Sequence, residues 1–379
     1  MGDKMLLIDE IIEDYSLRKE IVSQVEHSYD IEMSEHDSAF LCGLIKKHAP
    51  KKILEIGVAA GGTTAIILKC LEQNEEPYQM YSVDINSFYY RKPQEKCGYL
   101  AEGTIKKLKH GTHQFLFGTG IASHLDNIGN EIDFVILDTT HSLPGEMLDF
   151  LVIFPFLSKG AVVCLHDIAL SQYKVYAEHS YCTAILLSAV SGDKMINLKA
   201  LEDDEYSYPN IGAFRLTDET KPSLANLFIA LTLRWQYFPS SEEMDKYHKI
   251  IYKYYDKQLC TMFDKAVKMN AIRIINNKFK ELCTFSPNTR VLVYGAGVVG
   301  RSLLGLIRYI DNVELVGCVD KKYKNIGVVD GLEVQAADKI DINSFDYIIV
   351  AIQKEKIATE VVDYLQGIGV PRERIKLIG

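Results

Sequence analysis

Four polar side chains with the chemistry of a metal or acid–base site follow two apolar stretches of this sequence. The stretch 132–137 leads into Asp138, with His141 three residues later, and the stretch 161–165 leads into His166 and Asp167. Two carboxylates with an imidazole can bind a divalent cation, and such a cation can hold substrate oxygens and lower the pKa of a hydroxyl. His141 is also suited to act as a general base.

A second group of residues has the composition of a ligand-binding turn. The apolar residues 53–56 lead to three glycines within six residues, Gly57 and Gly61 among them, and Thr63 follows where a helix is expected to begin. Glu55 stands two residues before Gly57, where its charge would repel a pyrophosphate and attract an ammonium or sulfonium group. We therefore expect a ligand that is cationic at this point.

Alternating strands and helices are expected to position both groups. Residues 131–138 and 160–167 read as strands, and the amphipathic helix expected over 143–157 makes them one right-handed crossover unit with parallel strands. Ligands of such sheets bind beyond the carboxyl ends of the strands. The four side chains after these two strands should therefore share one edge of the sheet.

The strand expected at 78–84 ends in another acid, Asp84. An acidic residue at this distance from a glycine turn accepts hydrogen bonds from ribose hydroxyls in doubly wound sheets. A third strand at 113–117 is followed by Thr119. A turn residue at a strand end remains an alternative for Asp84.

With Glu55, the glycines and Asp84 in this order, residues 30–217 resemble the class I S-adenosylmethionine-dependent methyltransferases. The resemblance implies S-adenosylmethionine as cofactor, held by Glu55, Gly57, Gly61, Thr63 and Asp84. Many members of this class have an acid after the third strand for the adenine amino group. Thr119 stands near that place here instead of an acid, and we count it among the candidate cofactor-binding residues.

The later residues resemble metal-dependent O-methyltransferases that act on sugars of natural products, and the related cephalosporin hydroxylase group. Asp138, His141 and Asp167 fit the family's pattern, whereas His166 stands where a carboxylate is usual. The resemblance implies a divalent metal, Mg²⁺ or Mn²⁺, at Asp138, His166 and Asp167, with His141 taking the proton of the substrate hydroxyl. A site made by the two aspartates alone, with His166 facing the sheet interior, is the alternative.

A second glycine turn begins near residue 288. Gly295, Gly297 and Gly300 follow a predicted strand and precede a predicted helix, and Asp320 ends the next strand, which is the arrangement of a dinucleotide fingerprint. The segment is short and resembles the small Rossmann-like domains attached to bacterial sugar-modifying enzymes. Binding of NAD or a nucleotide-sugar and a purely structural role are both open.

These patterns predict an α/β protein of two Rossmann-like domains. We expect an N-terminal helical segment at 1–33, a doubly wound methyltransferase sheet at 34–217, a helical linker at 218–287 and the smaller domain at 288–379. The linker carries an apolar stripe that is compatible with a homodimer.

Composition limits the function classes. A net charge of −9 argues against a nucleic-acid binder, and no apolar run approaches the length of a membrane span. The eight cysteines are scattered without a Cys-x-x-Cys pair, which predicts reduced thiols and a cytoplasmic protein. The substrate that we expect is a small molecule.

Three functions are compatible with this sequence. The first is methyl transfer to a hydroxyl of a sugar or glycoside. The second is an NAD or nucleotide-sugar binding protein centred on the C-terminal domain, with a degenerate methyltransferase half. The third, metal-dependent hydroxylation, requires an oxygen-activating iron site, for which these residues give thin support.

Overall fold

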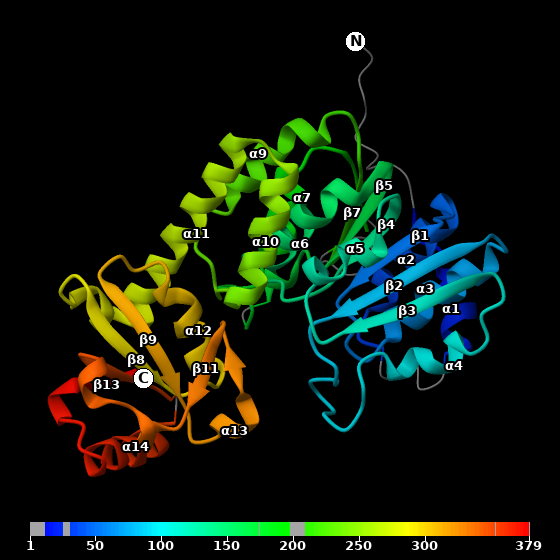
Figure 1. The fold of residues 1–379 in the computed structure, drawn as a ribbon. Coiled ribbons are helices and arrows are strands. Elements are labelled where there is room, and N and C mark those ends of the chain that lie inside the picture. The colour runs from blue at the N-terminus through cyan, green and yellow to red at the C-terminus, as the bar shows by residue number, and fades with distance from the viewer. Residues whose placement is uncertain (1–11, 26–30, 174, 198–208, 353, 379) are drawn as a thin grey trace. The chain divides into compact units, whose positions relative to one another are not determined.

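The computed structural model of the 379-residue chain describes residues 12–25, 31–173, 175–197, 209–352 and 354–378 (Figure 1). They form two compact units, one of residues up to 236 with 250–259, the other of 237–249 with 260 onward. The expected helical linker is divided between the two units. In the N-terminal segment, helix α1 covers Tyr15–Ser23, and the parts of that expected helical segment at 1–11 and 26–30 lie outside the described residues.

In the described part of the N-terminal unit, seven strands form one sheet in the order β3-β2-β1-β4-β5-β7-β6. They are β1 Lys52–Ile56, β2 Tyr78–Asp84, β3 Gly111–Phe117, β4 Ile132–Leu137, β5 Leu157–His166, β6 Asp193–Ile196 and β7 Ile211–Arg215. The first five strands in sheet order are parallel. Strand β7 pairs antiparallel with β5, and β6 pairs antiparallel with β7. The prediction of a doubly wound sheet is confirmed.

The α-helices in the described part of this unit precede β1, lie between strands or follow β7. They are α1, α2 Glu35–His48, α3 Gly62–Gln73, α4 Glu102–Ile105, α5 Leu125–Ile128, α6 Gly145–Ile153, α7 Cys182–Ala189 and α9 Thr220–Ala230. Helices α1, α2 and α3 pack on one another, and α7 packs on both α6 and α9. All nine residues of α6 are buried, as expected for a crossover helix between β4 and β5.

Helix α2 begins after a capping serine. The Ser34 hydroxyl accepts from the Asp37 amide and caps the helix, which ends at Ala49 in a left-handed conformation just before Pro50. This helix brings the Asp37 side chain into the interior, with 3% of its surface exposed.

The C-terminal unit has six strands among its described residues, in the order β10-β11-β9-β8-β12-β13. They are β8 Thr289–Tyr294, β9 Val313–Val319, β10 Val328–Val329, β11 Leu332–Gln335, β12 Tyr347–Ala351 and β13 Ile375–Ile378, with helices α12 Val298–Ile307, α13 Tyr323–Ile326 and α14 Glu355–Gly367. The pairing is parallel except between β10 and β11. The two remaining long helices of the chain are α10 Ser241–Tyr254 and α11 Lys257–Lys278.

Strands β10 and β11 extend the sheet of this unit beyond β9. They form a hairpin around Asp330 and Gly331, which both have positive φ, and Val329 pairs with Leu332. An Asp-Gly turn of two residues is a strong hairpin signal.

The structure also bears on the state of the cysteines and on the search for a membrane span. All eight cysteines are free thiols, and seven of them are buried, Cys283 being the exposed one. Within the described ranges, no helix combines the length and apolar character needed to cross a bilayer.

Candidate active site

The first glycine turn follows β1 and has backbone conformations that require glycine. Gly57 has φ +96°, and a Cβ at this position would lie 1.7 Å from the carbonyl oxygen of Asp138. Gly61 has φ +88°, and its Cβ would lie 2.6 Å from the Cα of Gly98. The turn therefore adjoins the segment after β4 on one side and the loop after β2 on the other.

Asp84 lies at the end of β2 and holds this turn. One of its oxygens accepts from the amides of Val58 and Ala59, each at 3.0 Å, and the other accepts from the Asn86 amide at 2.8 Å. The side chain is also partly exposed. A turn role and a ligand role are thus compatible at this residue.

Glu55 lies in the interior of the unit, whereas the sequence argument required it to face a ligand at the glycine turn. Its side chain is fully buried, and it accepts from the Thr64 hydroxyl of α3 at 2.7 Å. Burial raises the pKa of Glu55 to about 8, although hydrogen bonds from Ser82 and Thr64 oppose the shift. A carboxyl that is protonated at neutral pH does not attract a sulfonium, so Glu55 braces the turn from within the unit.

The start of α3 also differs from expectation. Gly61 is the residue before the helix and makes no side-chain cap, while the Thr64 hydroxyl serves Glu55. Thr63 is partly exposed in the first turn. The amides of this helix end are therefore left for a ligand or water. Thr119, after β3, is partly exposed and its hydroxyl pairs with the Nε2 of His124 at 2.8 Å.

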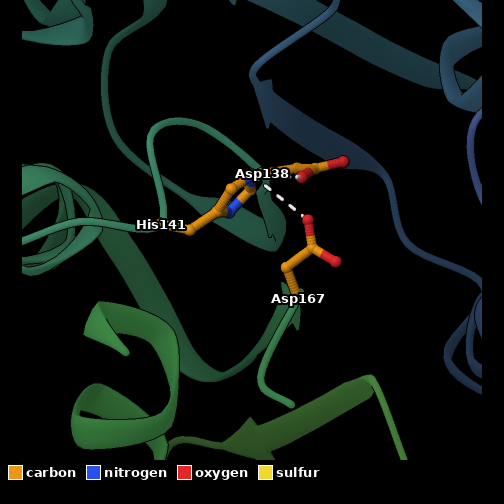
Figure 2. A group of neighbouring side chains, drawn as sticks. All are labelled: Asp138, His141 and Asp167. Carbon is orange, nitrogen blue, oxygen red and sulfur yellow. Dashed lines mark ion pairs between the residues drawn. The ribbon is translucent and has the colours of Figure 1, made fainter. Parts of the chain in front are cut away.

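The ends of β4 and β5 bring together Asp138, His141 and Asp167, as Figure 2 shows. The Nε2 of His141 lies 3.1 Å from a carboxylate oxygen of Asp167 and 3.9 Å from one of Asp138. One ligand atom from each side chain lies within 4.8 Å of the other two, and all three residues are partly exposed. These three of the four side chains expected at this edge of the sheet thus lie close together.

Two of these residues have strained backbones. His141 has φ +55° and Asp167 has φ +57°, a region that residues with a Cβ enter at a cost of about 1–2 kcal/mol. Asp167 is held by Asn210, whose amide donates to its carboxylate at 2.6 Å. Side chains in such conformations are often held for function.

His166 is not part of this three-residue group. Its Nδ1 lies 3.2 Å from Asp138 and 3.6 Å from Asp167, while its Nε2 lies 3.6 Å from Asp37 on α2. Burial lowers the pKa of His166, but Asp138, Asp37 and Asp167 outweigh it and hold the pKa well above the usual range. Both ring nitrogens of His166 therefore face carboxylates.

The sequence reasoning missed three side chains of this region: Asp37, Glu146 and Asn210. Glu146, in the first turn of α6, accepts from the amide of His141 at 2.6 Å and from the Thr139 hydroxyl at 2.9 Å. An acid soon after a strand end, at a helix start, was the readable signal for Glu146.

The charges favour a cation at this edge. The carboxylates of Asp37, Asp138, Glu146 and Asp167 outnumber the two imidazoles, so the group keeps negative charge even with both rings protonated. Burial raises the pKa of Asp138, but His166 and then His141 outweigh this and lower it. The carboxylates of Asp138 and Asp167 are oxygen ligands of the kind that Mg²⁺ and Mn²⁺ prefer, and the His141 ring lies beside them.

The second glycine turn repeats the construction of the first. Gly295 has φ +109°, and a Cβ on Gly300 would lie 1.7 Å from the carbonyl oxygen of Gly295, whereas Gly297 has open space. Asp320, at the end of β9, accepts from the amides of Ala296 and Lys322 at 2.8 and 2.7 Å. The predicted residues thus form one connected turn in the C-terminal unit.

Two family models match this chain. Residues 54–168 match a model described as a methyltransferase domain, a range that contains both the first glycine turn and the Asp138 group. The N-terminal unit contains a methyltransferase domain. Residues 287–376 match a model described as C2185-like, N-terminal, and the expected kinship of this part with sugar-modifying enzymes is not supported by that match. No curated protein matches the sequence.

Several solved structures are distantly similar to the methyltransferase part. An O-methyltransferase from Bacillus cereus in complex with SAH has 14% identity and a TM-score of 0.37, and the match covers 55% of this chain and 95% of that one. TomG from Streptomyces achromogenes, an O-methyltransferase involved in tomaymycin synthesis and solved with SAM, has 18% identity and a TM-score of 0.37, covering 56% and 92%. The SAH-bound methyltransferase PaMTH1 of Podospora anserina has 11% identity and a TM-score of 0.33, covering 54% and 87%.

Proposed function

We propose that the N-terminal unit is an S-adenosylmethionine-dependent O-methyltransferase that acts on a hydroxyl of a sugar or glycoside with the help of Mg²⁺ or Mn²⁺. The methyltransferase domain at residues 54–168 supports methyl transfer. The group of Asp138, His141 and Asp167 supports a hydroxyl acceptor and a divalent ion.

The observation that carries the proposal is the contact between the two halves of the site. Gly57 passes so close to Asp138 that no side chain fits between them. A donor bound at the glycine turn and an acceptor bound at Asp138 would therefore be neighbours, which is the first requirement for transfer between them.

Each residue has a distinct role in this proposal. The turn amides near Gly57 and Gly61, with Asp84, would hold S-adenosylmethionine, which supplies the methyl group when bound. Thr63 and Thr119 would contribute to the same site. Asp138 and Asp167 would hold the divalent ion, which when bound orients two substrate oxygens and lowers the pKa of a hydroxyl. His141 takes the hydroxyl proton on Nε2. His166, placed between Asp138 and Asp37, would orient the Asp138 carboxylate from the interior.

A nucleotide or nucleotide-sugar site in the C-terminal unit is a second proposal, not an alternative centre of function. Its support is the repeated construction of Gly295, Gly300 and Asp320, which matches the turn around Gly57 and Asp84. Gly297 leaves open space beside the start of α12, where a phosphate would be stabilised by helix amides.

The remaining expectations belong to the same proposal. The net charge of −9 supports a small-molecule substrate over a nucleic acid, and the free cysteines support a cytoplasmic location. The apolar stripe of the helical segment supports a homodimer.

Methyl transfer itself tests the proposal. The purified protein is incubated with methyl-labelled S-adenosylmethionine, Mn²⁺ and a panel of glycosides and nucleotide-sugars. We expect label in at least one acceptor, lost on chelation of Mn²⁺ and in Asp138→Asn, and kept in Asp218→Asn, whose carboxylate is 86% exposed. Full activity of Asp138→Asn, or transfer insensitive to chelation, would remove the metal site from the proposal.

A further inference from the structure

Glu146 is a buried carboxylate that the proposed function leaves without a role. Its side chain has no exposed surface. One of its oxygens accepts three hydrogen bonds: from the His141 amide at 2.6 Å, from the Thr139 hydroxyl at 2.9 Å and from the Thr139 amide at 3.3 Å. Three donors on one oxygen fix that oxygen in space and hold the loop in which His141 has a left-handed backbone.

The same oxygen faces the ring of His141. It lies 3.5 Å from Nδ1, and this nitrogen is buried without a hydrogen-bond partner of normal geometry. The opposite nitrogen, Nε2, points to Asp167 at 3.1 Å and to Asp138 at 3.9 Å. One edge of the ring therefore faces a fixed, buried carboxylate, and the other faces the candidate active site.

We propose that Glu146 is a positioning residue that keeps the ring proton of His141 on Nδ1. This leaves the lone pair of Nε2 directed at the substrate. The role of His141 as the base that takes the substrate proton rests on the proposed function, whereas the pairing of Glu146 with His141 does not. In the transfer, the hydroxyl proton passes to Nε2 while the substrate oxygen takes the methyl group, and the donor sulfur keeps the electron pair of its broken bond.

The burial of Glu146 makes it effective in this role. A carboxylate shielded from water interacts more strongly with a ring N–H than an exposed one. It also stabilises the imidazolium that forms when His141 takes a second proton, as an orienting carboxylate does in catalytic triads. Asp167 faces Nε2 and competes with Glu146 for the ring proton. The fraction of rings with the proton on Nδ1 therefore reports which of the two carboxylates attracts it more strongly.

Glu146→Gln removes the charge and keeps the shape. The amide oxygen of glutamine can take the place of the oxygen that accepts from Thr139 and from the His141 backbone, but as a neutral acceptor it attracts a proton on Nδ1 less strongly than a carboxylate does. Thr139→Val is the matched control, because it removes one hydrogen bond to the same oxygen and leaves the carboxylate in place.

Long-range ¹⁵N–¹H NMR of the ¹⁵N-labelled full-length protein reads the tautomer directly. The His141 signals are assigned by their absence in His141→Asn, and spectra are recorded in saturating Mg²⁺ at a pH where the ring is neutral. We expect the wild type and Thr139→Val to carry the proton mainly on Nδ1, and Glu146→Gln to lower that fraction several-fold. An equal fraction in wild type and Glu146→Gln would overturn the proposal.

Kinetics with any acceptor found for the enzyme add a second readout. We expect Glu146→Gln to lower kcat by about 100-fold, the lower end of the range for general-base catalysis, with KM little changed, and Glu146→Asp to recover part of the loss. A rise in KM with kcat unchanged would contradict the positioning role. If the tautomer responds to Glu146→Gln but no hydroxyl is methylated by the wild type, the pairing stands and the proposed function fails.

Discussion

Substitution of Gly57 by alanine should destabilise the N-terminal unit because two separate costs meet at this residue. The first is the left-handed conformation at φ +96°, about 1–2 kcal/mol for a residue with a Cβ. The second is the overlap of that Cβ with the carbonyl of Asp138 at 1.7 Å, which forces a backbone shift; overpacking of this kind costs about 1–3 kcal/mol.

Gly160→Ala separates these two costs. Gly160 lies in β5 of the same unit with φ +76°, but a Cβ there meets nothing within 4 Å. Both variants share the conformational cost and the lowered entropy of the unfolded chain, worth about 0.4–1 kcal/mol in the opposite direction. The difference between them isolates the overlap, so Gly57→Ala should be less stable than Gly160→Ala by about 1–3 kcal/mol.

Urea unfolding followed by tryptophan fluorescence measures this difference. The chain has a single tryptophan, Trp235, which lies in the N-terminal unit and is 2% exposed, so its emission reports the unfolding of that unit. Equal unfolding free energies for the two variants would refute the close approach of the glycine turn to Asp138. Because the displaced carbonyl belongs to a candidate metal ligand, Gly57→Ala should also weaken Mn²⁺ binding, and Gly160→Ala should not.

Three further predictions follow from the same geometry. The pKa of Glu55 is raised from 4.5 to about 8, so between these pH values the folded unit binds a proton that the unfolded chain has released. Urea titrations should therefore show the unfolding free energy falling as pH rises from about 4.5 to about 8, by at most about 1.4 kcal/mol per pH unit. This pH-dependent component should vanish in Glu55→Gln. Asp167→Asn should lose Mn²⁺ binding in calorimetry while remaining folded by circular dichroism, and unchanged affinity would exclude Asp167 as a ligand. In the C-terminal unit, Gly300→Ala should destabilise through its contact with Gly295, whereas Gly297→Ala should be nearly neutral; thermal melts that rank them in the reverse order would contradict the turn described here.

Much of the sheet could be predicted because its strands carry strong local patterns. The strand expected at 78–84 has those bounds in β2, and the crossover between β4 and β5 is parallel as the intervening helix required. Strand β6, Asp193–Ile196, escaped prediction because it has four residues and begins with two charged ones at the edge of the sheet. Edge strands of this kind lack the apolar run that marks central strands.

Side-chain directions were less predictable than strands. Glu55 lies on a central strand, where both faces are covered by helices, so an acid there is buried whichever way it points. The grouping of His141, and not His166, with the two aspartates depends on the left-handed turns at His141 and Asp167, which no local pattern shows. Glu146 reaches the site because the loop between β4 and α6 brings Thr139 and His141 back to the first turn of α6.

Calorimetric titration with S-adenosylmethionine tests the central claim most directly, with Asp84→Asn and its counterpart in the other unit, Asp320→Asn, as a matched pair. We predict micromolar binding to the wild type, strong weakening in Asp84→Asn and no change in Asp320→Asn. If S-adenosylmethionine does not bind the wild type, and NAD⁺ binds it and is lost in Asp320→Asn, the methyl-donor site at the first glycine turn would be contradicted.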